Sequence, residues 1–439
     1  MILALDLGST SFKTAVFDSA LRTVGTGSQA VGYRYGSAGE VELEVEEAAS
    51  AARKAIRQAI RSSGVRSGNL RAVALTSQAQ TFTILDARGH PRIPFISWQD
   101  ARAAQACRTL ARSPAMAQFH RHASFGALLP ALQICQLKHI GASLPHQLDR
   151  HDQVLMLPAF LVRQWTGTAV LDDNLAAMSG LASLVTRAWW PPALRTCKLH
   201  PSQLPRLIPV GTTAARTTAN ASAFGLPGGL PVVLAGNDQT AGAHAAELRE
   251  RGGLLLTLGT AQVAYAFSSR LARPHPDLIR GPFPGGGFYR MAADAWGGNL
   301  VHWARTVVAG SGTDDALFAL AAQATPGCQG LAVEPGPVPG TLTWTRLGPH
   351  HTPADLARSV LEFLVDRLTT MTARLGNADA HTRILVAGGG SASPFWVGLI
   401  EKRLGRPLAV TQAQPLLGAA RMRSEEHTSE LQSRQAISY

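Results

Sequence analysis

The chain has 439 residues, 46% of them hydrophobic, which is long enough for two domains with separate cores. The formal net charge of +12 would suit a nucleic-acid partner only if the basic residues clustered, but they are spread singly along the chain. The four cysteines form no C-x-x-C pair, which argues against a zinc site or a disulfide framework and favours a reducing compartment. We therefore expect no nucleic-acid partner.

The N-terminal stretch MILALDLGSTSFK lacks the basic and apolar segments of a signal peptide. Nowhere do 18 apolar residues follow one another, as a membrane span would need. We expect a cytoplasmic protein with no membrane partner.

The first ninety residues predict strands and helices of an α/β lobe. ILALDL and FKTAVFD read as a hairpin around a turn at 8–11, and a further strand is expected near VGTGSQAV. Residues 46–61 carry strong helix formers, with acidic residues first. LRAVALT and TFTILD are apolar enough for buried strands, so we expect a mixed sheet flanked by helices.

Residues 234–242, LAGNDQTAG, join an apolar strand to an alanine-rich helix. Asp238 is a candidate general base for a substrate hydroxyl, and the alternative is that it only caps the helix. Asn237 and Gln239 would either hydrogen-bond a polyol or hold the loop that aims the aspartate.

An internal repeat predicts a duplicated fold. Residues 4–17 can be laid over 255–267, so that Leu-Gly-Ser at 7–9 falls on Leu-Gly-Thr at 258–260. We expect an N-terminal lobe over 1–247 and a C-terminal lobe over 248–422. The final stretch, 423–439, resembles the translation of a sequencing adapter and is expected to be a non-native tail.

Three glycine-rich turns could receive a ligand. The turn after Asp6 offers backbone N–H groups and hydroxyls for a phosphate, and Asp6 itself could hold Mg²⁺ through water. The alternative for this turn is an ordinary polar hairpin. The second copy, at Gly259 and Thr260, has no acid or lysine. The third, AGGGSASP, ends a strand and begins a helix at Ser393, and it is not a dinucleotide fingerprint.

Taken in order, DLGSTSFK, SQAQTFTILD, ISWQDARA, GNDQTAGA, LTLGTA, WGGNLVHW and VAGGGSASPFW resemble the FGGY carbohydrate kinases of the actin-like ATPase superfamily. The resemblance spans residues 1 to about 422. It implies two ribonuclease H-like lobes, each a mixed β-sheet flanked by helices, with a cleft between them. It also implies an enzyme that uses ATP and Mg²⁺, with Asp238 as the catalytic base and Asp6 beside the metal. The residues that it implies for the nucleotide are Asp6, Gly8, Ser9, Thr10, Ser11, Lys13, Gly259, Thr260, Gly298, Gly389 and Ser393.

The sugar-contacting segment departs from familiar members of the family. This chain has Gln-Ala-Gln-Thr at 78–81 where xylulose kinases tend to have Gln-Met-His-Gly, and it lacks the Arg-Glu pair of glycerol kinases. Trp98, Asp100 and Arg102 resemble the family's W-x-D-x-R near the sugar, although packing and a helix start would also explain them. The expected substrate-binding residues are Gln78, Ala79, Gln80, Trp98, Asp100, Asn237 and Gln239.

The resemblance implies that a small sugar or polyol is phosphorylated, and a ketose such as a pentulose is the expected substrate. A homodimer is a possible assembly. Two alternatives stay open: another actin-like ATPase or small-acid kinase, and a degenerate protein that only binds sugar or nucleotide.

Overall fold

The computed structural model describes every residue except 144–148, 311, 338–339, 377–382 and 437–439. The chain forms two compact units. The first combines Met1–Ala245, Ser268–Tyr289 and Gln414–Tyr439, and the second combines Ala246–Phe267 and Arg290–Ala413. The polypeptide therefore passes between units at four places, whereas the sequence suggested a single seam near residue 247.

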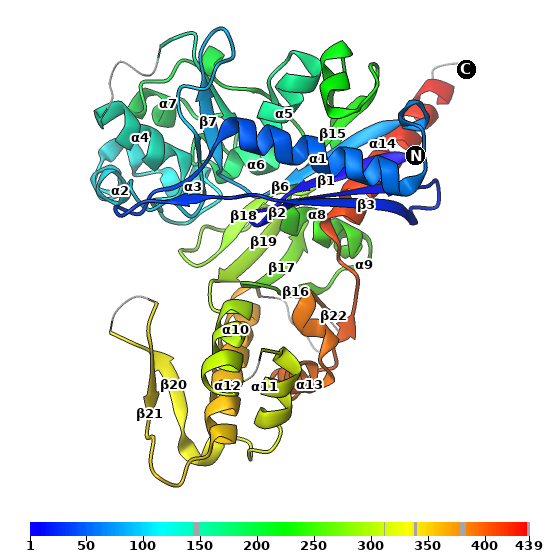
Figure 1. Cartoon of the computed structure of the whole chain (residues 1–439). Helices are drawn as coiled ribbons and strands as arrows, with labels where there is room; N and C mark the ends of the chain where they lie inside the picture. The colour runs from blue at the N-terminus through cyan, green and yellow to red at the C-terminus, as the bar shows by residue number, and fades with distance from the viewer. Residues whose placement is uncertain (144–148, 311, 338–339, 377–382, 437–439) are drawn as a thin grey trace. The chain divides into compact units, whose positions relative to one another are not determined.

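A six-stranded sheet forms the centre of the first unit, in the order β14-β15-β6-β1-β2-β3 (Figure 1). β1, β6 and β15 are parallel to one another, and β1 pairs antiparallel with β2. The predicted hairpin and buried strands are confirmed. The strands are β1 (Ile2–Leu7), β2 (Ser11–Phe17), β3 (Thr23–Ala30), β6 (Ala72–Ser77), β14 (Thr212–Arg216) and β15 (Pro231–Asn237).

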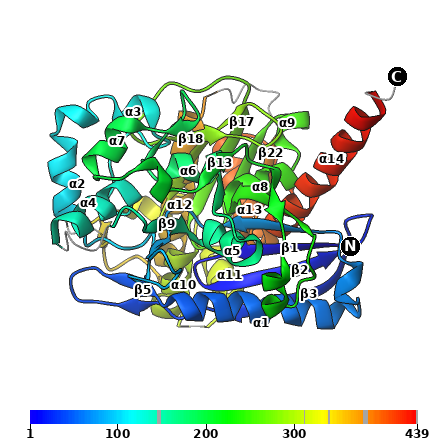
Figure 2. The same cartoon turned by 90° about the horizontal axis from the view of Figure 1, so that it is seen from above.

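Helix α1 (Val45–Ser63) covers one face of this sheet. It packs along β3 and β2, as the two views show (Figures 1 and 2). Glu46 and Glu47 lie in its first turn and Arg61 in its last, which suits the helix dipole. Its buried face consists largely of alanines, so the helix can approach the strands closely.

A second sheet of the first unit has the order β4-β5-β8-β7-β9. The first unit also contains two short strand pairs, β10–β13 and β11–β12, and the strand β18. These strands are β4 (Arg34–Tyr35), β5 (Val41–Leu43), β7 (Phe82–Leu85), β8 (Phe95–Ile96), β9 (Gln153–Met156), β10 (Val170–Asp172), β11 (Ala182–Ser183), β12 (Ala188–Trp189), β13 (Arg206–Ile208) and β18 (Ile279–Pro282). The other helices are α2 (Ala104–Ala111), α3 (Phe119–His122), α4 (Gln133–Ser143), α5 (Leu157–Thr166), α6 (Asp173–Met178), α7 (Pro191–Thr196), α8 (Asp238–Ala245) and α14 (Pro415–Ala436).

The second unit repeats the strand pattern of the first. In its sheet, β16 pairs antiparallel with β17 and parallel with β22, as β1 pairs with β2 and β6. This agrees with the internal repeat seen in the sequence. The strands are β16 (Leu254–Leu258), β17 (Gln262–Ser268), β19 (Phe288–Asp294), β20 (Ala332–Pro335), β21 (Leu342–Thr345), β22 (Ile384–Ala387) and β23 (Ala409–Val410). The helices are α9 (Leu248–Arg251), α10 (Gly298–Val307), α11 (Asp314–Ala321), α12 (Pro353–Arg374) and α13 (Pro394–Leu404).

Helix α14 belongs to the first unit, although residues up to 422 were expected in the C-terminal lobe. It packs against α8 and the strands β1, β6 and β15. Ala419, Ala420 and Met422 are buried in one cluster with Ala74 and Ala241. Small side chains on both sides of this contact explain the close packing. The expectation that residues after 422 are non-native stays a prediction.

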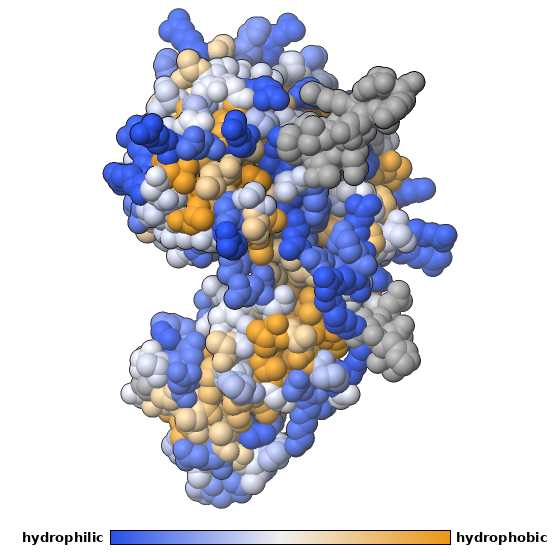
Figure 3. Space-filling view, turned by 90° about the vertical axis from the view of Figure 1, so that its right-hand side faces the viewer, coloured by the Kyte–Doolittle hydropathy of each residue, from blue (hydrophilic) through white to orange (hydrophobic). Residues whose placement is uncertain are grey.

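Among the described residues, no helix is long and apolar enough to cross a membrane. The face drawn in Figure 3 is mostly hydrophilic, and hydrophobic residues gather on parts of both units. Both units contain mixed sheets flanked by helices, which confirms the predicted α/β class.

Candidate active site

Three parallel strands of the first unit end at one edge of its central sheet. Asp6 is in register with Thr76 across β1 and β6, and Ser77 is in register with Asn237 across β6 and β15. Because the carboxyl ends of parallel strands meet at the same edge, Asp6, Gln78 and Asp238 lie on neighbouring chain segments there. The sheet thus brings together residues that are more than 230 positions apart in the sequence.

Asp6 carries a carboxylate with unused bonding capacity. Its Oδ1 atom is buried and has no hydrogen-bond partner among the described residues. The pKa of Asp6 is raised to about 7, mainly by burial and also by the negative charge of Asp238, while Lys13 opposes both effects. Lys13 stands in register with Asp6 on β2, with its side chain exposed. An unpaired carboxylate beside a lysine suits a cation together with an anionic ligand.

The turn that follows Asp6 can approach a ligand closely. A Cβ atom at Gly8 would lie 2.9 Å from the carbonyl oxygen of Ser11, so a larger residue would push the turn open. Thr10 is exposed and Ser9 and Ser11 are half-buried, so their hydroxyls can be reached by a ligand. Successive N–H groups and hydroxyls of this kind favour an anion.

Asp238 is the first residue of α8, where a kink in β15 sets the start of the helix. Gly236 has a φ of +72°, in the left-handed region that favours glycine, and the pairing of β15 with β6 shifts register between Leu234 and Asn237. Asn237 caps the helix, because its Oδ1 accepts a hydrogen bond of 2.7 Å from the N–H of Thr240. The capping role considered for Asp238 therefore falls to its neighbour.

The carboxylate of Asp238 is half-buried and makes few contacts. Its Oδ1 accepts from the N–H of Gln239 at 2.8 Å, and the Gln239 amide lies 3.5 Å from Oδ2. Burial raises the pKa of Asp238, and the hydrogen bonds from Gln239 partly oppose this rise. A carboxylate whose pKa is raised is a better proton acceptor when it is ionised, as a general base requires.

Asn237 is committed to the protein itself. Besides capping α8, it donates from Nδ2 to the sulfur of Met178 at 2.9 Å, and its backbone N–H donates to Asn174 at 3.0 Å. Only 2% of its surface is exposed. Of the two roles left open by the sequence, the structure supports holding the loop. Gln239 is half-buried beside Asp238, and its contact with a substrate stays a prediction.

The segment 78–81 links the first turn to the expected sugar site. Gln78 donates from Nε2 to the Gly8 carbonyl at 3.3 Å and to the Tyr33 hydroxyl at 2.9 Å, and its Oε1 accepts from Thr81. Its amide therefore braces the turn. Gln80 has a φ of +67°, which is uncommon for a residue with a side chain.

Gln80 donates from its side chain to the Met178 carbonyl at 3.3 Å, and Ala79 accepts a backbone bond from Thr81 at 2.8 Å. Gln80 and Asn237 thus lie on two sides of Met178, whose carbonyl and sulfur they respectively contact. The positive φ of Gln80 is a strained backbone conformation, and such strain tends to occur at functional sites. The substrate roles of Gln78, Ala79 and Gln80 stay predictions.

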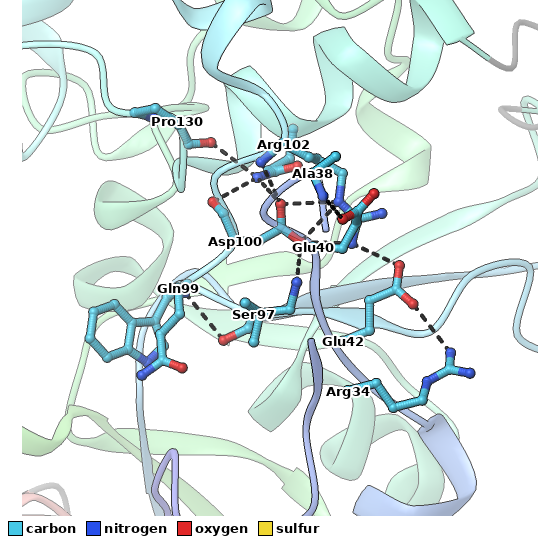
Figure 4. A network of polar contacts seen from close by, with 12 residues as sticks. Arg34, Ala38, Glu40, Glu42, Ser97, Gln99, Asp100, Arg102 and Pro130 are labelled. Carbon is cyan, nitrogen blue, oxygen red and sulfur yellow. Dashed lines mark hydrogen bonds and ion pairs between the residues drawn. The ribbon is translucent and has the colours of Figure 1, made fainter. Parts of the chain in front are cut away.

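Asp100 belongs to a polar network that locks the loop after β8 (Figure 4). Arg102 donates to both of its carboxylate oxygens, Gln136 donates to one of them, and the N–H of Val41 donates at 2.8 Å. Glu42 accepts from Arg102 in turn. Asp100 is 1% exposed, so its charge is paired inside the protein.

Trp98, two residues earlier, is 40% exposed and its N–H donates to Thr81 at 3.2 Å. The network around Asp100 therefore positions the loop that presents Trp98. A substrate contact by Trp98 or Asp100 stays a prediction.

The second unit places its glycine turns at the ends of β16 and β22, which are parallel neighbours. The N–H of Gly298 donates to the Gly259 carbonyl at 2.8 Å, and the N–H of Asn299 donates to the Thr260 carbonyl at 3.2 Å. A Cβ atom at Gly298 would lie 2.6 Å from the Gly259 oxygen. The predicted turn and the start of α10 are therefore in direct contact.

The third glycine turn lies against the same β16 strand. A Cβ atom at Gly388 would lie 2.6 Å from the Leu258 carbonyl, whereas nothing lies within 4 Å of one at Gly389. Ser393 caps α13 by accepting from the N–H of Trp396 at 3.3 Å. Gly389 is thus open to a ligand and Ser393 has a structural partner. Nucleotide contacts by these residues and by Gly298 stay predictions.

Sequence reasoning missed three residues beside these turns. Tyr33 holds Gln78, and burial raises the pKa of its hydroxyl to about 12. Asn174 holds the start of α8. Gln262, next to the second turn, is 1% exposed and neither polar atom of its amide has a partner among the described residues. A single amide residue between the glycine turn and the apolar run VAYAF is a sequence signal for Gln262. The contacts of Tyr33 and Asn174 join distant segments and leave no local pattern.

Two domain families match the chain. Residues 1–244 match the N-terminal domain and residues 254–423 match the C-terminal domain of the FGGY family of carbohydrate kinases. The chain belongs to the FGGY family. This assignment confirms the resemblance drawn from the motifs and the enzyme class, a carbohydrate kinase.

Individual FGGY relatives are distant. A glycerol kinase of Rhizobium rhizogenes is 27% identical over 267 residues, which cover 59% of this chain and 52% of that protein. A xylulose kinase of Escherichia coli is 26% identical over 381 residues, which cover 81% of this chain and 75% of that protein. The match thus spans about half of the first relative's length and three quarters of the second's.

The fold of this FGGY chain matches a solved structure closely. A ligand-bound xylulose kinase from Lactobacillus acidophilus superposes with a TM-score of 0.88 at 18% identity, covering 97% of this chain and 89% of the other. This similarity confirms the predicted fold class, mixed β-sheets flanked by helices in two units. It does not distinguish one sugar or polyol from another.

Proposed function

We propose that this FGGY kinase transfers a phosphoryl group from ATP to a hydroxyl of an uncharged ketose such as a pentulose. The observation that carries the proposal is the pair of carboxylates at neighbouring strand ends, Asp238 and Asp6, with the glycine turn beside them. Phosphoryl transfer needs mainly positioning and charge stabilisation, and these residues can supply both. Asp238 accepts the proton of the attacking hydroxyl, and Lys13 offsets phosphate charge.

The donor set near Asp6 fits Mg²⁺. The unpaired Oδ1 of Asp6 offers one carboxylate ligand, and no group of three or more possible metal ligands is found among the described residues. Mg²⁺ commonly takes one or two carboxylates and completes its shell with water and substrate phosphates. Bound there, it would neutralise charge on the phosphate oxygens. The turn at Gly8 would hold those oxygens through backbone N–H groups.

The expected sugar segment favours a neutral substrate. Its charged pair, Asp100 and Arg102, is satisfied internally, which leaves amides and the exposed face of Trp98 to meet a ligand. Gln80 and Gln239 can each donate and accept hydrogen bonds, as neighbouring hydroxyls require. A sugar acid would need a free cation instead. Among the curated relatives, the xylulose kinase of Escherichia coli is the comparison that favours a ketose. A homodimer stays a prediction.

The test is a screen of the purified full chain with Mg²⁺ and ATP against ketoses, aldoses, polyols and sugar acids, read by coupled detection of ADP. We expect release of ADP that depends on a ketose. Asp238→Asn should lower kcat by roughly 10²- to 10⁴-fold, the usual contribution of a general base, and leave ATP binding intact.

Asp86→Asn, in the turn after β7, is the matched control that should keep its activity. Full turnover by Asp238→Asn would remove Asp238 as the base. Turnover with sugar acids alone would overturn the assignment of a neutral ketose.

A further inference from the structure

The buried amide of Asn174, on α6, joins three segments of the first unit. Its Oδ1 accepts from the N–H of Asn237 at 3.0 Å, and its Nδ2 donates to the Thr240 hydroxyl at 3.0 Å and to the Pro282 carbonyl at 2.8 Å. The side chain is fully buried, with 0% exposed. Three of the four hydrogen bonds that an amide can make are therefore used, and two of them lie on either side of Asp238.

Asn174 also lies directly beneath the kink before α8. A Cβ atom at Gly236 would be 3.0 Å from both Cγ and Oδ1 of Asn174, so only glycine allows this approach. The Gly236 carbonyl is held from the other side, because the Thr76 hydroxyl donates to it at 2.9 Å. The backbone that leads to Asp238 is thus fixed by two side chains from separate elements.

The carboxylate of Asp238 has no such support of its own. Among the described residues, its side-chain hydrogen bonds come from its sequence neighbour Gln239. The direction of the carboxylate consequently depends on the backbone of residues 236–240. A shift of that backbone would move the base relative to whatever hydroxyl it meets.

We propose that Asn174 is a positioning residue for the catalytic base, acting through the backbone on both sides of Asp238. The proposal rests on the proposed function only for the role of Asp238. It assigns to a residue 64 positions earlier in the chain the task of aiming the carboxylate. Removing its amide leaves the N–H of Asn237 buried without a partner, so the start of α8 should rearrange to satisfy it.

The first test is kinetic. Asn174→Ala should lower kcat by roughly 10²-fold, the loss expected from a misplacement of about 1 Å, with KM for ATP unchanged. Gln203→Ala is the matched control, because Gln203 is also a buried amide of the first unit, with bonds to His200 and Asp149. It should lose stability without a comparable loss of kcat. Equal losses of kcat in both variants would overturn the proposal.

A second variant keeps the shape of the side chain. Asn174→Asp retains an acceptor for the N–H of Asn237 but loses the amide that donates to Thr240 and Pro282. If Asn174 aims Asp238 through the backbone, this variant should recover part of the kcat that Asn174→Ala loses. A folded Asn174→Asp protein with a kcat as low as that of Asn174→Ala would contradict the proposal.

Hydrogen exchange separates this proposal from the proposed function. In Asn174→Ala, the amides of residues 237–240 should exchange faster than in the wild type, and in Gln203→Ala they should not. This result is expected whichever substrate is used. If the wild type released no ADP with any acceptor, the proposed function would fail, while hydrogen exchange would still report whether Asn174 holds the backbone around Asp238. Unchanged exchange at 237–240 in Asn174→Ala would overturn the positioning role of Asn174 even in an active kinase.

Discussion

Asp6 and Asp238 hold charges of the same sign at neighbouring strand ends. Burial makes both carboxylates harder to ionise, and the pKa of Asp6 rises to about 7. In the protein without ligands, the folded state therefore binds protons that the unfolded chain has already released between about pH 4 and pH 7. Stability should fall as the pH rises through this window, since the folded state alone opposes ionisation.

Asp6→Asn should remove this loss. We expect the variant to have a higher free energy of unfolding than the wild type at pH 8, by at most about 4 kcal/mol, and little difference at pH 4. Urea unfolding of the ligand-free wild type and variant at both pH values measures this difference in the free energy of unfolding. A wild type that is more stable than Asp6→Asn at pH 8 would contradict the burial of this charge.

Asp86 provides a control of opposite sign. Hydrogen bonds from the backbone of His90 and other residues of its turn hold the pKa of Asp86 below its ordinary value. The ionised Asp86 carboxylate therefore stabilises the folded protein above the pKa that Asp86 has in the unfolded chain, and this stabilisation is lost as the pH falls through the lower pKa of the folded state. Asp86→Asn should therefore weaken the protein at pH 8 and have less effect at pH 4.

Residues that act within a local pattern could be predicted from the sequence. Asp6 lies near the end of a clear strand, the turn at Gly8 follows that strand, and Asp238 follows a second strand, so a candidate base and a candidate phosphate turn could be proposed. The division of labour between Asn237 and Asp238 could not, because either residue can cap a helix. Asn174 and Tyr33 act through contacts across distant segments, and no local spacing reveals them.

Among the elements, α14 determines how α8 is held. A Cβ atom at Gly418 would lie 1.8 Å from the carbonyl oxygen of Ala241, so the two helices touch backbone to backbone. Arg421 donates to the Ala245 carbonyl at 3.1 Å near the other end of α8. The helix that begins with Asp238 is therefore covered along its length by a helix from the end of the described chain.

Gly418→Val should push α14 away from α8. Overpacking of this kind costs about 1–3 kcal/mol, and here the obstacle is backbone, which cannot rotate aside. Urea unfolding should show the loss. Gly398→Ala in α13 is the control, because nothing lies within 4 Å of a Cβ there, and alanine should stabilise that helix by about 0.5–1 kcal/mol. A Gly418→Val protein as stable as wild type would contradict the packing.

At the scale of the whole molecule, the first unit is assembled from three separate segments of the chain. Residues 268–289 supply Pro282, the partner of Asn174, and residues from 414 onward supply α14. The internal repeat predicted two units. It could not predict that residues 268–289 and residues from 414 onward belong to the first unit, because a repeat aligns strands and does not say which unit a later segment packs against. The expected single seam reflects that limit of the pattern.

A fragment of residues 1–247 should therefore fail to fold cooperatively. It would expose the apolar cluster that Ala419, Ala420 and Met422 cover and leave the amide of Asn174 short of one partner. Circular dichroism during urea unfolding measures it, with the full chain as reference. Co-expression with residues 248–439 should restore a folded complex. A sharp transition in the isolated fragment would contradict the dependence on later segments.

The covering of α8 by α14 also has a consequence in time. Ala245 and Arg421 are 176 residues apart, so at roughly 5–20 residues per second the ribosome takes about 10–35 s to make the second after the first. Throughout that interval a growing chain holds Asp238 on a helix that α14 does not yet cover. The start of α8 can reach its final packing only after α14 has been made, so the order of synthesis sets a delay between making the candidate base and burying its helix.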